Sequence, residues 1–434
     1  MQTIKILLLL LVLGFSFKSS GQRVPAEWEK QDGIIITWFY EDLLHNYSVD
    51  DVHLTMVKNL VEANSVYINY QNNKQKNRIE NLLCTNNLSI ENIKWIKTDT
   101  RMGAYPRDFG PEWIYNNNSL NVVDMNWTFY GYIPHTRTFA GLINHTLENY
   151  DNKFAVRLEM PVYATSKIVS EGGGKEFNGN GILMVIEQTE LARNPTFTKQ
   201  QIETEYKRVF NLKKIIWLPK PSYEDENMFT DYIIDDKVHK KALRSASANG
   251  HIDEFCRFVS SNTILLAEVT QEEANSSFSQ KINKARLDIC FKILSNETDA
   301  DGKPFKIVRI PVAEPIYLEA PENSRIYKNI IEMKRIVQLE SLLDGSSFLA
   351  ADTICILPAL SYCNFSIANN VVLIAKYWKP GMPEIIKDKD KQALSILQDL
   401  FPERKIIAIE TLPLNIGGGG LHCNTRHIPC LTEK

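Results

Sequence analysis

The segment that decides the fold and the chemistry of this chain lies near its C-terminus and reads Gly417-Gly418-Gly419-Gly420-Leu421-His422-Cys423. Four consecutive glycines permit positive φ angles and let the backbone approach a ligand closely, so this stretch predicts a functional loop. Cys423 follows the glycines after only two residues. A thiol held there, with a histidine and carboxylates elsewhere in the chain, is a candidate nucleophile for covalent catalysis.

Four further segments combine turn-forming residues with titratable or amide side chains. They are Arg107-Asp108-Phe109-Gly110-Pro111, Glu171-Gly172-Gly173-Gly174, Gly250-His251-Ile252-Asp253-Glu254-Phe255 and Ser361-Tyr362-Cys363-Asn364-Phe365. We expect their polar residues at strand ends or turns, where a rigid scaffold usually places functional groups.

The composition describes a folded protein without a surface for nucleic acid. The chain has 434 residues, 44% of them hydrophobic, and a net charge of −3 from 49 basic and 52 acidic residues. Such a length can bury a large core. Because the charges are interspersed, the basic stripe that neutralises phosphates is missing, which argues against a nucleic-acid partner.

The first residues predict export. Lys5 precedes an apolar run from residue 6 to residue 17, and small residues follow it up to Gly21. This pattern is typical of a secretory signal that is removed, so we expect residues 1–21 to be cleaved and the mature chain to be periplasmic or extracellular. The run is shorter than the ~20 residues of a membrane span, so no membrane contact is expected after cleavage. The sequence is compatible with a homo-oligomer but does not define one.

Apolar and β-branched runs alternate with segments of helical periodicity, which predicts an α/β or α+β class. Strands are expected at residues 33–38, 65–70, 92–96, 120–124, 181–186, 263–267 and 370–375, and helices at 52–63, 199–209 and 388–400. No Gly/Ser-rich or Pro-rich linker divides them, so residues 22–434 are expected to form a single catalytic domain. An acidic and then lysine-rich stretch at residues 221–249 predicts an inserted surface loop.

A thiol, a histidine and several carboxylates suit one kind of substrate. Carboxylates repel anions and form bidentate hydrogen bonds with a guanidinium group, so the substrate is expected to carry one. Only a thiolate is nucleophilic, and a bound cation together with His251 would favour its ionisation. Attack of Cys423 on the central carbon, followed by proton transfer through His251, would release ammonia and then hydrolyse a thiouronium intermediate.

With these motifs in order, the chain resembles the family of agmatine deiminases and Porphyromonas-type peptidylarginine deiminases, within the guanidine-modifying enzyme superfamily. The resemblance begins at Pro25-Ala26-Glu27-Trp28-Glu29, passes through the four segments above and ends at Cys423. It implies the pentein fold, a five-bladed pseudo-symmetric α/β propeller with the active site in its central channel. It also implies a hydrolase that needs neither metal nor cofactor.

The resemblance assigns a role to each candidate residue. Asp108 and Asp253 are expected to bind the guanidinium nitrogens, and His251 to act as acid and base. Glu171 is expected to orient the histidine, and Cys423 to be the nucleophile.

Further substrate contacts are expected from Asn364, Trp127, Tyr130 and Trp38. Tryptophans are core residues by default, and an aromatic lining for the alkyl stem of the substrate is the sharper interpretation. Asn364 also lies in an Asn-Phe-Ser sequon, where glycosylation would be incompatible with a role in the site.

Other interpretations of single residues remain open at this stage. His251 and Asp253 could bind a metal with a cysteine as third ligand, although no second closely spaced ligand pair is present. Glu171 could simply brace the glycine turn.

Two substrates compete within the family. Agmatine would give N-carbamoylputrescine, whereas the peptidylarginine branch acts on C-terminal arginines and binds their carboxylate through arginines that follow its Asp-containing motif. Here residues 124–131 contain no arginine, and the next arginine in the chain is Arg137. The segment looks more like the aromatic segment of agmatine deiminases, which favours agmatine. Export favours an arginine-containing peptide. An amidinotransferase and a non-catalytic guanidinium-binding protein are alternatives of other classes.

Overall fold

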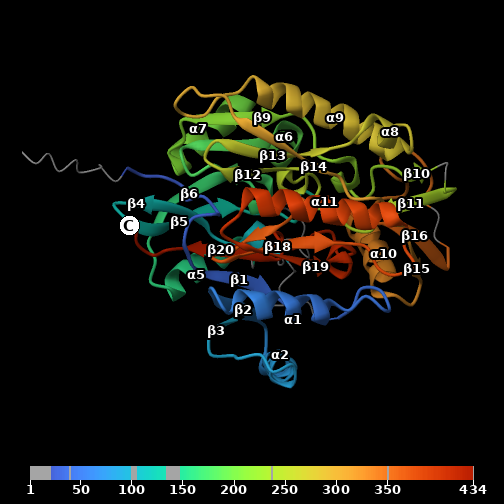
Figure 1. Ribbon diagram of the computed structural model, residues 1–434, viewed down its shortest axis with the longest axis horizontal. Coiled ribbons are helices and arrows are strands. Elements are labelled where there is room, and N and C mark those ends of the chain that lie inside the picture. The colour runs from blue at the N-terminus through green and yellow to red at the C-terminus, as the bar shows by residue number, and fades with distance from the viewer. Residues whose placement is uncertain are drawn as a thin grey trace, which may run out of the picture.

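The computed structural model describes residues 21–38, 41–98, 105–132, 147–235, 238–348 and 351–433. Residues 1–20 of the predicted signal, and Arg137, lie outside these ranges. The chain forms a mixed α/β structure of several small sheets flanked by helices (Figure 1). Within the described ranges, no helix has both the length and the apolar character needed to cross a bilayer.

Five of the sheets in the described ranges repeat one pattern. A first strand pairs antiparallel with a second, and the second pairs parallel with a third. Because parallel neighbours need a long crossover, the described part of each connection between the second and third strands contains at least one helix. The repeated unit is therefore strand, strand, helix, strand.

The elements of the five units have the following bounds. The first unit contains β20 (Thr425–Pro429), β1 (Gln31–Thr37), α1 (Val49–Leu60) and β2 (Ser65–Tyr70), extended by α2 (Asn73–Thr85) and β3 (Ile93–Lys97). The second contains β4 (Glu112–Asn116), β5 (Ser119–Asn126), α5 (Tyr150–Arg157) and β6 (Val162–Val169). The third contains β7 (Glu176–Phe177), β8 (Ile182–Ile186), α6 (Glu187–Arg193), α7 (Lys199–Phe210) and β9 (Lys214–Leu218). The fourth contains β12 (Cys256–Ser260), β13 (Thr263–Glu268), α8 (Gln271–Ala274), α9 (Phe278–Ser295) and β14 (Lys306–Pro311). The fifth contains β17 (Ser366–Ile367), β18 (Val371–Lys376), α11 (Glu384–Leu400) and β19 (Lys405–Glu410).

Local chemistry explains where these elements begin and what they bury. The central strand β8 is buried at every position, as expected for a strand covered on both faces. Helix α7 begins with a capping box, in which Thr198 and Gln201 exchange hydrogen bonds with each other's backbone. Its buried residues recur along one face, from Ile202 to Phe210, and form one hydrophobic cluster with residues of β8 and of β5 and β6 from the second unit.

The periodicity in the sequence located these elements well. All seven predicted strands are present, with ends shifted by at most a few residues, and the helices predicted at 52–63, 199–209 and 388–400 are α1, α7 and α11. These segments are long runs with one clear period, for which pattern and tertiary structure agree.

The prediction of an inserted surface loop at residues 221–249 is wrong. This region contains η2 (Tyr223–Asp225), β10 (Ile233–Asp235) and β11 (Lys240–Arg244), and it joins β16 (Thr353–Leu357) and β15 (Leu318–Pro321) in a sixth sheet, with α10 (Arg325–Val337) between β15 and β16. Arg244 is fully buried and donates to the Tyr223 carbonyl and the Asp231 carboxylate. Compensation of its charge allows part of a region that looks polar in sequence to be buried.

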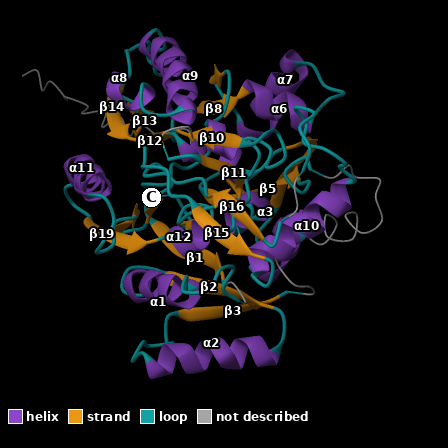
Figure 2. Ribbon diagram, turned by 90° about the vertical axis from the view of Figure 1, so that its right-hand side faces the viewer, coloured by secondary structure: helices purple, strands orange, loops and turns teal. Residues whose placement is uncertain are grey.

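The repeated unit places the sequence motifs at equivalent positions. Each of the five motifs ends one or two residues before the first strand of a unit, namely β4, β7, β12, β17 and β20. Figure 2 shows helices such as α1, α7, α9 and α11 around the periphery and loops toward the middle of the molecule. Short helices carry three of the motifs: α3 (Pro106–Phe109), η1 (Gly172–Gly174) and η3 (Ile252–Glu254).

Candidate active site

Cys423 lies in the turn between α12 (Leu412–Asn415) and β20, and its side chain is 1% exposed. The preceding glycines are needed for close packing. A Cβ atom at Gly419 would lie 2.6 Å from the ring of Tyr105, and one at Gly420 would lie 2.6 Å from Oδ1 of Asn364. The loop therefore packs the thiol closely against neighbouring motifs.

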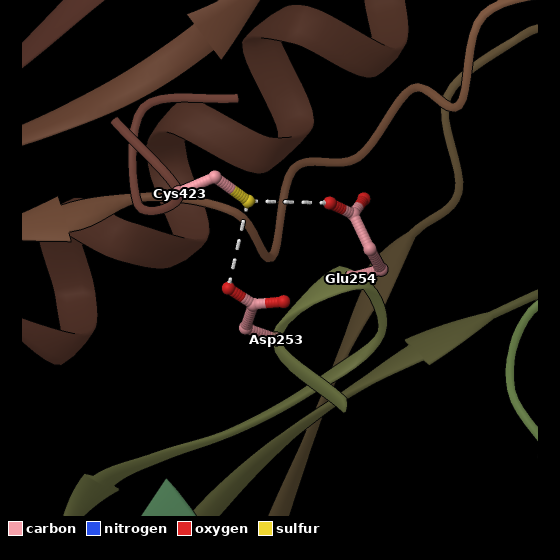
Figure 3. A group of neighbouring side chains, drawn as sticks. All are labelled: Asp253, Glu254 and Cys423. Atoms are coloured by element: carbon pink, nitrogen blue, oxygen red, sulfur yellow. Dashed lines mark hydrogen bonds between the residues drawn. The ribbon is translucent and has the colours of Figure 1, made fainter. Parts of the chain in front are cut away.

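Three side chains from two other motifs surround the sulfur atom of Cys423. Nδ2 of Asn364 donates to Sγ at 3.1 Å. Sγ also lies 3.8 Å from Asp253 Oδ2 and 3.9 Å from Glu254 Oε1, and Figure 3 shows both carboxylates beside the sulfur. Burial, and then the nearby carboxylates of Asp253 and Glu254, raise the pKa of the thiol well above its usual value. The thiol is therefore neutral in the unliganded protein, and His251 alone does not ionise it.

The geometry of the same cluster argues against a metal bound by His251 and Asp253. Among the described residues, the group whose ligand atoms lie within 4.8 Å of one another consists of Asp253, Glu254 and Cys423, without His251. A thiolate with two carboxylates and no imidazole mixes soft and hard donors and resembles neither a zinc site nor a calcium site. The histidine is committed to a different set of partners.

His251 is fully buried between two carboxylates. Its Nδ1 lies 3.6 Å from Asp108 Oδ1 and its Nε2 lies 3.8 Å from Glu171 Oε2, which are ion-pair distances rather than hydrogen bonds. Burial lowers the pKa of the imidazole, but Asp108, Glu171 and Asp253 outweigh it and raise the pKa to about 9. His251 is therefore a cation at neutral pH, able to donate a proton.

Asp108 is held by two hydrogen bonds from other segments. The hydroxyl of Tyr130 donates to Oδ2 at 2.9 Å, and the backbone N–H of Gly173 donates to Oδ1 at 3.1 Å. Burial raises the pKa of the carboxyl to about 6, and the charge of His251 opposes that shift. At neutral pH Asp108 is ionised and faces the imidazolium.

Glu171 is anchored by a partner that the sequence did not reveal. Arg193 donates from Nε to both carboxylate oxygens, at 2.8 Å and 3.1 Å. Burial would raise the pKa of Glu171, but the charge of Arg193 lowers it to about 2. Glu171 therefore stays ionised at ion-pair distance from His251 and stabilises the charge of the imidazole. It also directly precedes the glycine turn η1.

The loop that carries His251 is fastened by Asp225 of η2. Its Oδ2 accepts from the backbone N–H of His251 at 2.7 Å, and its Oδ1 accepts from the backbone N–H of Ala248 at 2.9 Å. The region predicted as a surface loop therefore positions the histidine. Its acidic residues had suggested solvent exposure, but Asp225 is 1% exposed.

Several buried polar atoms of the site have no hydrogen-bond partner among the described residues. They are both ring nitrogens of His251, Oδ1 of Asp253 and Nε1 of Trp127. Leaving such atoms unpaired costs free energy, so a cluster of them is a sign of a ligand site. The set includes donors as well as a carboxylate acceptor.

The three predicted aromatic contacts are placed differently. The ring of Tyr130 lies 5.7 Å from that of His251, and Trp127 packs edge-on against Tyr130 at 5.8 Å, so both belong to the wall of the site. Trp38 lies in the hydrophobic core, where Nε1 donates to Asp50 at 2.7 Å and the ring stacks on His53. Because Nε1 of Trp38 already has a hydrogen-bond partner and the side chain is fully buried, the core interpretation is favoured over contact with substrate.

Two residues adjoining the predicted set were missed as site residues. His422 bonds through Nδ1 to Asp253 Oδ2 at 2.6 Å and through Nε2 to Glu27 Oε2 at 2.7 Å. Both stand in quoted motifs, His422 directly before the thiol and Glu27 in the N-terminal segment. Their separation by 395 positions kept the sequence from pairing them.

Two cavities adjoin neighbours of the catalytic residues, although neither is lined by Cys423, His251, Asp108 or Asp253. One of about 50 Å³ is lined partly by Glu254, Ser361 and Cys363, and another of about 30 Å³ by Arg107 and His422. Each has room for a few water molecules, since one water needs about 10–15 Å³ of such space.

Comparison with known proteins identifies the family and the relatives of this chain. The family model of Porphyromonas-type peptidyl-arginine deiminases matches residues 23–242 and 238–429. The agmatine deiminase of Pseudomonas fluorescens (strain SBW25) is 25% identical over 421 residues, covering 95% of this chain and 96% of that protein.

Solved structures share the fold over nearly the whole chain. The agmatine deiminase of Enterococcus faecalis superposes with a TM-score of 0.70 at 21% identity, covering 94% of this chain and 96% of that one. A cysteine-to-serine variant of the agmatine deiminase of C. jejuni, with substrate bound, gives a TM-score of 0.65 at 19% identity, covering 95% and 98%. At these identities the likeness establishes a common fold, that of the penteins.

Proposed function

The chain belongs to the Porphyromonas-type peptidyl-arginine deiminase family of guanidino-modifying hydrolases, and from that premise we propose that it converts agmatine and water to N-carbamoylputrescine and ammonia. The observation that carries the proposal is the buried Oδ1 of Asp253, which lacks a partner among the described residues while Oδ2 of the same carboxylate lies 3.8 Å from the thiol. A cation bound to that oxygen would lie beside the sulfur.

Asp108 and Asp253 bind the guanidinium from two motifs. Two ionised carboxylates in a buried site repel each other, and a planar cation with several N–H donors relieves that repulsion. Its charge also offsets the carboxylates that hold the thiol neutral, so the pKa of Cys423 falls when substrate binds. Substrate binding and nucleophile activation are thereby coupled.

Cys423 releases its proton to solvent as its pKa falls, and the thiolate attacks the central guanidinium carbon, giving a tetrahedral adduct. His251, protonated in the free protein, donates its proton to the departing nitrogen, which leaves as ammonia. A thiouronium remains on the sulfur. Neutral His251 takes a proton from water, and the hydroxide adds to the same carbon. The C–S bond then breaks while the hydroxyl proton passes to the departing sulfur, which restores the neutral thiol and leaves a urea group.

The residues around the carboxylate cage, which is formed by Asp108 and Asp253, favour agmatine over a peptide. Trp127 and Tyr130 offer apolar surface for an alkyl stem, and Asp124 to Gly131 contains no arginine that could pair with a carboxylate. Arg193, which does lie nearby, is occupied by Glu171.

A substrate panel tests this choice. Ammonia release is measured for agmatine, free arginine, and peptides with internal or C-terminal arginine, with Cys423→Ala as the blank. The proposal expects kcat/KM for agmatine to exceed that for every arginine compound. A preference for C-terminal arginine peptides would instead identify a peptidylarginine deiminase, the substrate class in the name of the family model.

The same assay separates the remaining alternatives. An amidinotransferase would pass the amidino group to an amine and release no ammonia from agmatine without an acceptor. A non-catalytic guanidinium-binding protein would bind agmatine without turnover.

The repeated strand, strand, helix, strand unit supports a five-bladed propeller with the site in its central channel, formed by residues 22–434 as a single catalytic domain. Cleavage of residues 1–21 and export remain predictions of the sequence. Comparing the N-terminus and the compartment of the mature protein in its host tests both.

A further inference from the structure

The imidazole of His422 lies between two carboxylates that both require a donor. Nδ1 is 2.6 Å from Asp253 Oδ2 and Nε2 is 2.7 Å from Glu27 Oε2. An ionised carboxylate only accepts hydrogen bonds, and a neutral imidazole has one donor and one acceptor nitrogen. Both bonds can form together only if each ring nitrogen carries a proton.

Both carboxylates are held in the ionised form. Burial would raise the pKa of Glu27, but His422, Arg107 and Arg257 lower it well below its usual value. Burial likewise opposes ionisation of Asp253, and the hydrogen bond from His422 is the largest influence that lowers its pKa. With both carboxylates ionised, the two short bonds require a proton on each ring nitrogen of His422.

The other charged groups around His422 fix Glu27 rather than Asp253. Oε2 of Glu27 lies 3.2 Å from Arg257 and 3.3 Å from Arg107, and His427 approaches it only to 4.0 Å. Glu27 is thus a buried anchor, and His422 is the group that joins it to the site.

Resting on the proposed function, we propose that His422 is a positioning residue which, held by Glu27, keeps Asp253 ionised and turned so that Oδ1 faces the guanidinium. The bond to Oδ2 leaves Oδ1 as the oxygen available to substrate, in agreement with the lack of a partner for Oδ1 among the described residues. Without the imidazolium, the neighbouring carboxylates Asp108 and Glu254 would favour protonation or rotation of Asp253.

Two substitutions of His422 divide its contacts. In His422→Asn the side-chain amide can take the place of Nδ1 and still reach Asp253, whereas in His422→Gln it can take the place of Nε2 and reach Glu27 instead. The control is His427→Gln, another buried histidine in the same segment, which has no recorded bond to Asp253 in the described structure.

The kinetic experiment measures KM and kcat of each variant for agmatine. Each assay is run the same number of degrees below the melting temperature of that variant. We expect His422→Gln to raise KM at least tenfold, His422→Asn to raise it less, and His427→Gln to leave it within twofold of the wild type. Equal effects of the Asn and Gln variants, or an unchanged KM in both, would overturn the proposal. If His422 had a purely structural role, its substitutions would lower stability but would not produce this order of KM values.

The spectroscopic arm does not depend on turnover. In protein labelled with 15N-histidine, the His422 resonances, assigned by their loss in His422→Gln, are expected to show protons on both ring nitrogens at pH 7, as the two bonds to carboxylates require. A single protonated nitrogen at pH 7 would refute the charged bridge. Failure of the wild type to deiminate agmatine would instead count against the proposed function, and the protonation of His422 would still decide this inference.

Discussion

The two oxygens of Asp253 have different duties, and the residue-scale predictions begin there. Oδ2 contacts His422 and the thiol, whereas Oδ1 has no partner among the described residues. Asp253→Asn keeps the shape but removes the charge opposite the cation. We expect kcat/KM for agmatine to fall about 100-fold, in line with ~3 kcal/mol for a buried charged hydrogen bond.

The comparison variant is Asp108→Asn, which should fall by a similar factor because Asp108 is the second carboxylate of the cage. Steady-state ammonia release at pH 7.5 measures both. Full activity in either variant would exclude that residue from guanidinium binding.

The charges of Asp108 and His251 predict a bell-shaped dependence of kcat/KM on pH. Binding of the cation needs ionised Asp108, whose pKa burial raises to about 6, and proton donation needs cationic His251, whose pKa the surrounding carboxylates raise to about 9. Since kcat/KM reports the free enzyme, activity should rise through about pH 6 and fall through about pH 9. An acid limb below pH 4 would rule out Asp108 as the controlling group.

At the scale of elements, the glycine turn of η1 brings two site segments together. A Cβ atom at Gly173 would lie 2.5 Å from Nδ1 of His251 and 2.9 Å from Oδ1 of Asp108, whereas one at Gly174 would meet nothing closer than 3.7 Å. Gly173→Ala is expected to lower kcat/KM at least 100-fold, because the ion pair must separate. Gly174→Ala should stay within threefold of the wild type, and equal effects would contradict this packing.

The sequence predicted elements and motifs better than it predicted their cross-connections. Strands such as β2 and β8 follow from uninterrupted apolar runs, and all five motifs lie at corresponding positions of the repeated unit. The bond between His422 and Glu27 and that between Glu171 and Arg193 depend on tertiary contact, so no local pattern marks them. The role of Asp225 was missed because the charges around it suggested solvent, although folding buries and pairs Asp225 and Arg244.

At the scale of the whole molecule, the site affects stability through its charges. The folded-state pKa of His251, about 9, lies above the unfolded value of 6.5. The stabilisation is therefore complete below about pH 6.5 and is lost as the pH rises through about 9. A shift of this size corresponds to about 3 kcal/mol.

Urea unfolding of the wild type and of His251→Gln at pH 6 and pH 10 tests that linkage. The difference in unfolding free energy between the two proteins should shrink by about 3 kcal/mol at the higher pH. A difference independent of pH would show that the imidazole is not charged in the folded protein.

The central claim is that the thiol of Cys423 forms a covalent bond to the substrate carbon. The most direct measurement is mass spectrometry of enzyme quenched in acid during turnover of agmatine, with the Cys423 peptide compared between the wild type and Cys423→Ala. We predict a mass gain equal to agmatine less ammonia on the wild-type peptide, and neither adduct nor ammonia from the folded variant. Ammonia production by Cys423→Ala at the wild-type rate would contradict the account.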